Sequence, residues 1–356
     1  MEHLASLTDW NEDIVRGVLD HAAALKADPD AFADAAARKV LFMIFEKPSL
    51  RTRVSFETGI VRMGGHAINY DVNSSPLGAG KESLSDTIKV VSRYADLIVA
   101  RLFKHTDLDE MMAHSGVPVI NGLTDYTHPC QIMADLLTIR EHRGTLKGRT
   151  LCFLGDGFNN VTHSLLHGCA MLGMHIRVGC PPGEDYEPKA SVLETARALA
   201  APHGSEVVVT HDAREAARGA DVVYTDSWMS YHIDPSEMER RVGKFMPYQV
   251  TAEIMGLADS EAIFMNCLPA ARGYEQTAEV IDGPQSVVFD QAGNRMHAQN
   301  AIMLRLLQQA CNARGVPHSG GQTQCPGRPL SRGARRASVG GTLWVSGGLG
   351  HPARIL

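Results

Sequence analysis

Hydrophobic residues along the chain occur in two patterns that alternate with each other. Short continuous apolar runs, such as "VLFMIF", "LIVA", "TLCFL" and "VVY", are separated by longer segments in which apolar residues recur every three or four positions. The short runs are typical of strands buried on both faces of a parallel sheet, and the longer segments are typical of amphipathic helices. Strands that alternate with helices predict an α/β fold with parallel sheets.

The predicted elements form two successive groups. The first group has the strands "VLFMIF", "HAINYD", "DLIVARL" and "PVINGL" and helices over about 9–26, 50–63, 84–94 and 129–144. The second group has the strands "TLCFLGD", "HIRVGC", "EVVVT", "DVVYTD", "AIFMNCL" and "SVVFD" and helices over about 160–172, 188–202, 212–219 and, in pieces, 235–258. Asp9 and Glu12 have the spacing of a capping box for the first helix. Residues 296–313 are predicted to form a final amphipathic helix.

A polar turn, "TLKGRT", separates the two groups. We therefore predict two doubly wound parallel-sheet domains, residues 1–147 and 148–297, with a final helix at 298–314 that packs back on the first domain. Residues 315–356 are rich in Gly, Pro, Ser and Arg and contain no acidic residue. Because such a segment buries too little apolar surface to offset its ordering entropy, we expect a disordered tail.

Charge and cysteine content narrow the class of protein. The formal net charge of −6 gives the chain no general attraction to nucleic acid or anionic membranes, so a nucleic-acid role driven by the arginines of the tail is only a distant alternative. Neither a secretory signal nor an apolar run of about 18 residues is present in the sequence. The seven cysteines are scattered without a CxxC pair, which is typical of reduced thiols. We expect a cytoplasmic protein that does not cross a membrane.

The stretch "EKPSLRTRVSFE" places cationic and hydroxyl groups where a buried strand gives way to a helix. Ser49, Leu50, Arg51, Thr52 and Arg53 supply backbone N–H groups, two hydroxyls and two guanidiniums at a helix N-terminus. Ligands of open α/β sheets bind beyond the carboxyl ends of the strands, and this combination suits a phosphate group. On the motif alone, a capped helix with surface arginines remains an equal alternative.

Two further strand ends in the first half carry polar side chains. Arg101 ends the strand "DLIVAR", and "THPCQ" follows the strand "PVINGL". Pro129 suits the first helical position, so His128 lies at the N-cap and Gln131 lies three residues on, on the same face. A single histidine is more often structural. Three strand ends that converge on polar groups favour the functional interpretation here.

The strand ends of the second half carry a different set. Asn160 begins a helix after "FLGDGFN", where a GxGxxG dinucleotide motif is absent. Asp226 and Ser230 follow the strand "VVYT", and Cys267 and Leu268 follow "AIFMN". A carboxylate together with amide and hydroxyl groups suits a ligand that carries an ammonium and a carboxylate, such as a free amino acid.

Four motifs in this order resemble the aspartate/ornithine carbamoyltransferases, and in particular the ornithine branch. They are S-x-R-T-R (49–53), H-P-x-Q (128–131), D-x-W-x-S (226–230) and C-L-P (267–269), and the resemblance extends over about residues 5–313. It implies a trimer with active sites shared between neighbouring subunits. The first domain then binds carbamoyl phosphate and the second binds L-ornithine, and the reaction yields citrulline and phosphate in arginine biosynthesis without metal or cofactor.

The resemblance also assigns residues. The carbamoyl-phosphate site comprises Ser49, Leu50, Arg51, Thr52, Arg101, His128, Gln131 and Arg295, with Lys81 contributed to a neighbouring subunit's site. The ornithine site comprises Asn160, Asp226, Ser230, Tyr231, Cys267 and Leu268. Arg101, His128 and Cys267 are the expected catalytic residues, the backbone carbonyls of Cys267 and Leu268 face the reacting groups, and the Leu268–Pro269 bond is cis.

Three segments depart from the family pattern. Asn266 replaces the usual histidine before Cys-Leu-Pro, Tyr231 and His232 replace the usual Met-Gly, and Gly293 replaces a usual glutamate. The departures at the acceptor side leave open another amine, such as putrescine, lysine or an acylated ornithine. Asn266 and Gly293 together also leave open a carbamoyl-phosphate-binding protein without turnover. Aspartate is disfavoured as an acceptor because Asp226 repels a second carboxylate.

Overall fold

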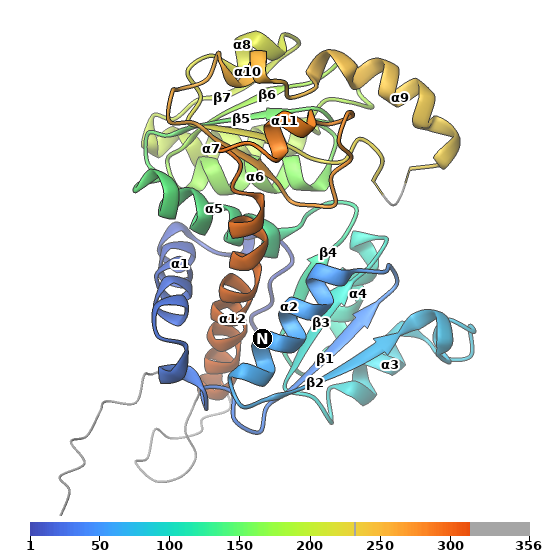
Figure 1. The fold of residues 1–356 in the computed structure, drawn as a ribbon. Helices are drawn as coiled ribbons and strands as arrows, with labels where there is room; N and C mark the ends of the chain where they lie inside the picture. The colour runs from blue at the N-terminus through green and yellow to red at the C-terminus, as the bar shows by residue number, and fades with distance from the viewer. Residues whose placement is uncertain (231–232, 314–356) are drawn as a thin grey trace, which may run out of the picture.

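A computed structural model describes residues 1–230 and 233–313 of the chain. Its two parallel sheets lie in separate halves of the molecule, with helices packed around each (Figure 1). The predicted α/β fold is therefore confirmed. The prediction of a disordered tail concerns residues 315–356, which lie outside the described residues.

All strands within each sheet are parallel. The first sheet has the order β2-β1-β3-β4 and the second has the order β7-β6-β5-β8-β9. The strands are β1 (Val40–Phe45), β2 (His66–Asp71), β3 (Leu97–Arg101), β4 (Val119–Leu123), β5 (Thr150–Leu154), β6 (His175–Gly179), β7 (Val207–Thr210), β8 (Val222–Thr225) and β9 (Ile263–Asn266).

The helices connect these strands and cover both faces of the sheets. They are α1 (Glu12–Ala27), α2 (Leu50–Arg62), α3 (Leu84–Val91), α4 (His105–His114), α5 (Pro129–Arg143), α6 (Asn160–Met171), α7 (Ala190–Ala200), α8 (Ala213–Ala217), α9 (Met238–Phe245), α10 (Ala252–Met255), α11 (Ala278–Ile281) and α12 (Val288–Ala313). Among the described residues, none of these helices combines the length and the apolar character that crossing a bilayer demands.

Each sheet reverses its winding direction once. In the first sheet β1 has β2 on one side and β3 on the other, and in the second sheet β5 lies between β6 and β8. In such sheets the loops after the two central strands diverge to opposite faces and leave a crevice where ligands bind. S-x-R-T-R follows β1 and D-x-W-x-S follows β8, whereas H-P-x-Q follows β4 and C-L-P follows β9.

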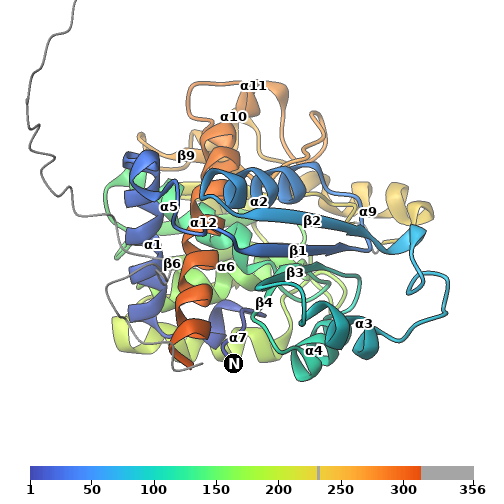
Figure 2. The ribbon, with the colours of Figure 1, turned by 90° about the horizontal axis from the view of Figure 1, so that it is seen from below.

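Alternate residues of β1 pack into different cores, because successive side chains of a strand point to opposite faces. Leu41 and Met43 belong to the core shared with α1, α2, α5 and α12, whereas Phe42 and Ile44 belong to the core with α3 and α4. Figure 2 shows these helices on opposite sides of the first sheet.

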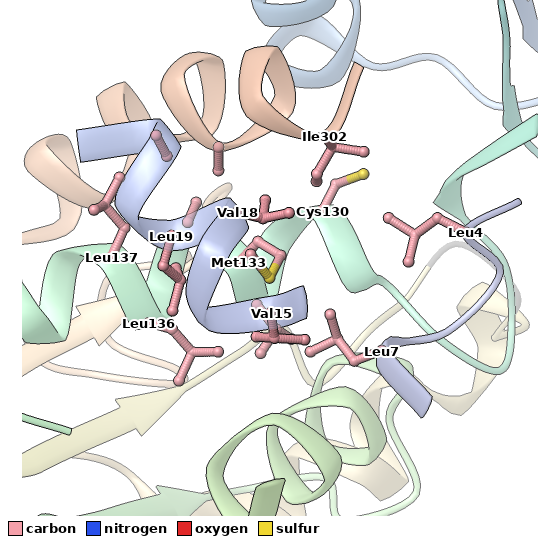
Figure 3. Packing of buried hydrophobic residues seen from close by; sticks show 14 of the residues in the cluster. Leu4, Leu7, Val15, Val18, Leu19, Cys130, Met133, Leu136, Leu137 and Ile302 are labelled. Carbon is pink, nitrogen blue, oxygen red and sulfur yellow. The ribbon is translucent and has the colours of Figure 1, made fainter. Parts of the chain in front are cut away.

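The helices α1, α5 and α12 pack together beside the first sheet. Val15 and Val18 of α1 lie against Met133 of α5, and Ile302 of α12 approaches from the other side (Figure 3). Every residue of α5 from Pro129 to Ile139 is buried. The burial holds the N-terminus of α5, which carries His128, in a fixed position between the two halves.

Two local predictions are wrong. The predicted last strand, 286–290, makes only a single bridge between Ser286 and Phe264, and α12 already begins at Val288. The capping box is formed by Ser6 and Asp9 around a short 3₁₀ turn, and Asn11 caps α1 instead. In both cases a tertiary or cap contact overrides the local propensity.

Candidate active site

A pocket of about 400 Å³ lies between the two halves, at the carboxyl ends of the central strands. Most of the residues that the sequence predicts for the two sites line it. They are Ser49, Leu50, Arg51, Thr52, Arg101, His128, Gln131 and Arg295 from one set and Asn160, Asp226, Ser230, Cys267 and Leu268 from the other. Lys81 is exposed and does not line this pocket, and Tyr231 lies outside the described residues.

The loop after β1 caps α2, and several cationic side chains lie close to it. The Ser49 hydroxyl accepts a hydrogen bond from the backbone N–H of Thr52 at 3.3 Å. The hydroxyl of Thr52, which is buried, accepts from Arg101 at 3.4 Å and from Arg295 at 3.2 Å. Arg51 lines the same pocket. Three guanidiniums and a helix N-terminus therefore face one small volume, which suits a dianionic group.

The second arginine of the motif takes a different direction. Arg53 is exposed and pairs with Glu57, one helical turn away, at 3.5 Å. It does not line the pocket. The S-x-R-T-R stretch therefore supplies one guanidinium to the pocket rather than two.

Lys47 is a pocket residue that the sequence did not single out. Its side chain is buried, its Nζ has no hydrogen-bond partner, and Nζ lies 4.4 Å from the centre of the Phe103 ring. Burial, and then the nearby Arg101 charge, lowers the pKa of Lys47 to about 8. The sequence feature that could have identified Lys47 is its position just after an apolar strand and two residues before the N-cap residue Ser49.

The N-terminus of α5 presents His128 and Gln131 to the pocket. The His128 backbone N–H donates to the Ser164 hydroxyl at 2.8 Å, while its Nδ1 is buried without a partner. Burial, followed by the charges of Arg295 and Arg101, holds the pKa of His128 well below its usual value. The imidazole is therefore neutral at pH 7 and acts as a hydrogen-bonding group rather than as a cation.

A buried carboxylate fixes the orientation of the Gln131 amide. Asp135 accepts from Gln131 Nε2 at 2.8 Å, so the amide oxygen of Gln131 faces Arg295 and the pocket. Asp135 also accepts from Tyr224 at 3.0 Å and from Gln291 at 2.8 Å. Burial raises the pKa of Asp135 to about 6. Because Tyr224 lies on β8, this network joins the two halves beneath the pocket.

Asp226 is the charged group at the opposite wall. It accepts from Asn159 Nδ2 and from the Cys267 thiol, each at 2.9 Å. Burial, and then the Asp226 charge, raises the pKa of Cys267 well above its usual value. The thiol therefore stays protonated and donates to Asp226, which excludes it as a thiolate nucleophile at neutral pH. Asn159, which the sequence did not predict, orients the carboxylate.

Asn160 connects the two halves directly. Its side-chain amide donates to the backbone carbonyl of Thr124, which follows β4. Ser230 lies within 3.5 Å of Asn159 Nδ2. Met229, on the same loop, is a further pocket residue that the sequence did not predict.

Two departures from the family pattern lie away from the pocket. Asn266 is buried and does not line the pocket, because its side chain binds Leu268 N–H and Gln276. Gly293 is exposed on α12, and a Cβ placed there has no atom within 4 Å. The Leu268–Pro269 bond is cis, as the resemblance implies. The third departure, Tyr231–His232, lies outside the described residues.

Comparisons with known proteins agree with this arrangement. The family described as "Aspartate/ornithine carbamoyltransferase, carbamoyl-P binding domain" matches residues 2–141, and its "Asp/Orn binding domain" matches residues 147–306. A protein of Methanothermobacter thermautotrophicus named ornithine carbamoyltransferase is 51% identical over 85% of this chain and 98% of its own length.

Solved structures show the same likeness. The ornithine carbamoyltransferase of Pyrococcus furiosus matches with a TM-score of 0.80 and 42% identity, over 85% of this chain and 96% of its own. An acetylornithine transcarbamylase in complex with acetylcitrulline matches with a TM-score of 0.77 at 30% identity, over 86% of this chain and 99% of its own. The chain belongs to the aspartate/ornithine carbamoyltransferase family.

Proposed function

We propose that this protein transfers the carbamoyl group of carbamoyl phosphate to the δ-amine of L-ornithine, giving L-citrulline and phosphate. The observation that carries the proposal is one pocket with a cluster of cations on one wall and a buried carboxylate with amide and hydroxyl groups on the other. The first wall matches a phosphate and the second matches an amino acid. The names of the relatives support ornithine as the acceptor.

In this proposal the first wall grips carbamoyl phosphate. Arg51, Ser49 and the N–H groups at the start of α2 hold the phosphate, and Lys47 lies close enough to add a further charge. Arg101, Thr52 and the neutral His128 donate to the carbamoyl oxygen, where negative charge grows during attack. The amide oxygen of Gln131, oriented by Asp135, accepts from the carbamoyl NH₂.

The second wall binds ornithine. Asp226 and Ser230 bind its α-ammonium group, and Asn160 binds its carboxylate. The uncharged δ-amine attacks the carbamoyl carbon, and the carbonyls of Cys267 and Leu268 accept from the reacting N–H groups. The C–O bond to phosphate breaks, and the departing phosphate takes the proton of the amine. Holding both substrates in line supplies much of the acceleration.

The proposal extends to domains, assembly and place in the cell. Residues 1–147 and 148–297 form the two substrate-binding domains, with the final helix packed back on the first, in a cytoplasmic homotrimer of arginine biosynthesis. Exposed apolar side chains on α2, on the edge strand β2 and after α3 support an interface along this edge of the first sheet. They include Leu50 (74% exposed), Val61 (55%), Ile68 (41%) and Tyr94 (75%). Lys81 then reaches a neighbour's pocket.

The direct test is product formation by the purified full-length chain. Carbamoyl phosphate and L-ornithine should yield citrulline and phosphate in equal amounts, and phosphate release should depend on ornithine. If phosphate release stays at the rate of spontaneous carbamoyl-phosphate breakdown with every amine supplied, the protein is a binding protein without turnover, and the proposal is wrong.

A further inference from the structure

The turn that carries Cys267 and Leu268 has an unusual backbone. Leu268 has a φ of 57°, in the left-handed region that a leucine rarely adopts. Such a conformation is costly for a side chain with a Cβ and persists only where neighbouring groups hold it. The turn lines the pocket, so whatever holds Leu268 also sets the wall that faces the reacting amine.

Asn266 makes the contact that holds this turn. Its Oδ1 accepts from the Leu268 N–H at 2.7 Å, and its backbone N–H donates to Gln291 Oε1 at 3.0 Å. In a trans peptide the N–H and C=O point in opposite directions. Fixing the Leu268 N–H toward Asn266, which is outside the pocket lining, therefore aims the Cys267 carbonyl away from Asn266.

Gln276 fixes the orientation of Asn266 in turn. Asn266 Nδ2 donates to Gln276 Oε1 at 3.1 Å, and Gln276 Nε2 donates to the carbonyl of Ala271 at 3.2 Å. Both amide side chains are fully buried. A backbone carbonyl only accepts, so Ala271 dictates which end of Gln276 faces it. The Nε2 of Gln276 therefore faces Ala271, and its Oε1 faces Asn266. This in turn directs Asn266 Nδ2 toward Gln276 and leaves Asn266 Oδ1 opposite the Leu268 N–H.

We propose that Asn266 and Gln276 form an amide relay that positions the Cys267 and Leu268 carbonyls for the acceptor amine. Neither side chain touches substrate, so both are positioning residues. The inference rests on the proposed function and explains how this chain dispenses with the histidine that its family usually has at position 266. Asn266 Oδ1 accepts from the Leu268 N–H, and an unprotonated histidine Nδ1 is chemically able to accept the same hydrogen bond.

The relay contains no group that titrates near neutral pH, and this gives a sharp test. Asn266→His should keep kcat/KM for ornithine within about threefold at pH 8, because Nδ1 replaces the acceptor. At lower pH that nitrogen becomes protonated, so its N–H points at the Leu268 N–H and the hydrogen bond is lost. The variant should therefore lose activity on acidification more steeply than the wild type, in which protonation of the attacking δ-amine already lowers the rate.

Removing the relay should affect the two substrates unequally. Asn266→Leu and Gln276→Leu should each lower kcat/KM for ornithine roughly 10- to 100-fold, while the carbamoyl-phosphate affinity stays within about twofold. The double variant should lose little more than either single variant, because both act through one relay. Independent losses that multiply, wild-type kinetics in either single variant, or an equal loss of carbamoyl-phosphate affinity would overturn the proposal.

A second readout works without activity. The Leu268 amide should be protected from hydrogen exchange in the wild type and should exchange faster in Gln276→Leu, whose altered side chain does not touch that amide. Unchanged protection contradicts the relay. If the wild type makes no citrulline but Gln276→Leu still speeds exchange of the Leu268 amide, the proposed function is wrong and the relay stands as a structural device.

Discussion

The chemistry of the pocket depends on how each polar side chain is surrounded rather than on its type alone. His128 and Lys47 lie among guanidiniums in a buried site, which disfavours their charged forms. Cys267 is held as a thiol by burial and by Asp226. At residue scale the pocket therefore combines a neutral imidazole and a neutral thiol with a group of arginines and a lysine whose pKa is lowered to about 8.

The two arginines of the S-x-R-T-R motif provide a matched pair. Arg51→Ala removes a cation that lines the pocket and should raise KM for carbamoyl phosphate roughly 10- to 100-fold, with the fold intact. Arg53→Ala removes an exposed cation paired with Glu57 and should change KM by no more than about twofold. Steady-state kinetics at saturating ornithine measures both. Equal effects of the two substitutions would contradict the assignment of Arg51.

We predict that Lys47 makes carbamoyl-phosphate binding dependent on pH. With a pKa of about 8 in the free protein, its amine is partly deprotonated at pH 8, and a bound phosphate favours the ammonium and raises that pKa. Binding should therefore take up about half a proton at pH 8, and the affinity should fall as pH rises above about 8. Calorimetry in two buffers of different ionisation enthalpy measures the uptake.

The control for this experiment is an exposed lysine of the same region. Lys47→Met should abolish the proton uptake and weaken binding below pH 8, whereas Lys104→Met should leave both unchanged. Proton uptake that survives in Lys47→Met would assign the linkage to another group and remove Lys47 from the site.

At the scale of elements, the sequence predicts best where a single local pattern decides the structure. The run "VLFMIF" is buried on both faces, so its continuous apolar character identified β1 at once. Residues 286–290 have similar local propensity, yet only Ser286 finds a strand partner, and packing against the rest of α12 decides the conformation. A pattern of five residues does not contain that long-range contact.

The same distinction applies to the candidate site. Residues at strand ends were predictable because parallel strands bring their carboxyl ends to one edge. The directions of Arg53 and Asn266 were not predictable, because they depend on hydrogen-bond partners in the folded chain. Asn266 pairs with Gln276, ten positions away across a loop. Lys47 was missed because its environment, set by burial and by the nearby Arg101, arises only in the folded chain.

Two glycines in helices should respond in opposite ways to the same substitution. Gly293 is exposed in α12 with open space around its Cβ position, so Gly293→Ala should raise the free energy of unfolding by about 1 kcal/mol without changing activity. A Cβ at Gly59 of α2 lies 2.1 Å from Asn300 Oδ1, so Gly59→Ala should destabilise the protein. Urea unfolding compares them. Destabilisation by Gly293→Ala would contradict the open environment described for it.

At the scale of the whole molecule, we predict that one chain does not complete its own site. Lys81 is exposed and away from the pocket of its own chain. If it serves a neighbour, Arg101→Ala and Lys81→Ala should each be nearly inactive. Subunit exchange between the two in equal amounts should recover about a quarter of wild-type activity through hybrid sites.

The recovery distinguishes shared sites from separate ones. A control mixture of Arg101→Ala with itself should stay inactive, which excludes an effect of the exchange procedure. If Arg101 and Lys81 serve the same chain's site, no combination restores an intact pocket and no activity will return. A wild-type protein that is monomeric and fully active in solution would also contradict the shared site.

The choice of acceptor tests the central claim most directly. We predict that kcat/KM for L-ornithine exceeds that for putrescine, L-lysine and N-acetyl-L-ornithine at saturating carbamoyl phosphate, because Asp226, Ser230 and Asn160 are arranged to read a free amino acid. A diamine without a carboxylate, or the acetylated acceptor, that surpasses ornithine tenfold would show a transition-state preference of about 1.4 kcal/mol in the wrong direction. That result would contradict the amino-acid pocket and leave only a carbamoyltransferase with a different acceptor.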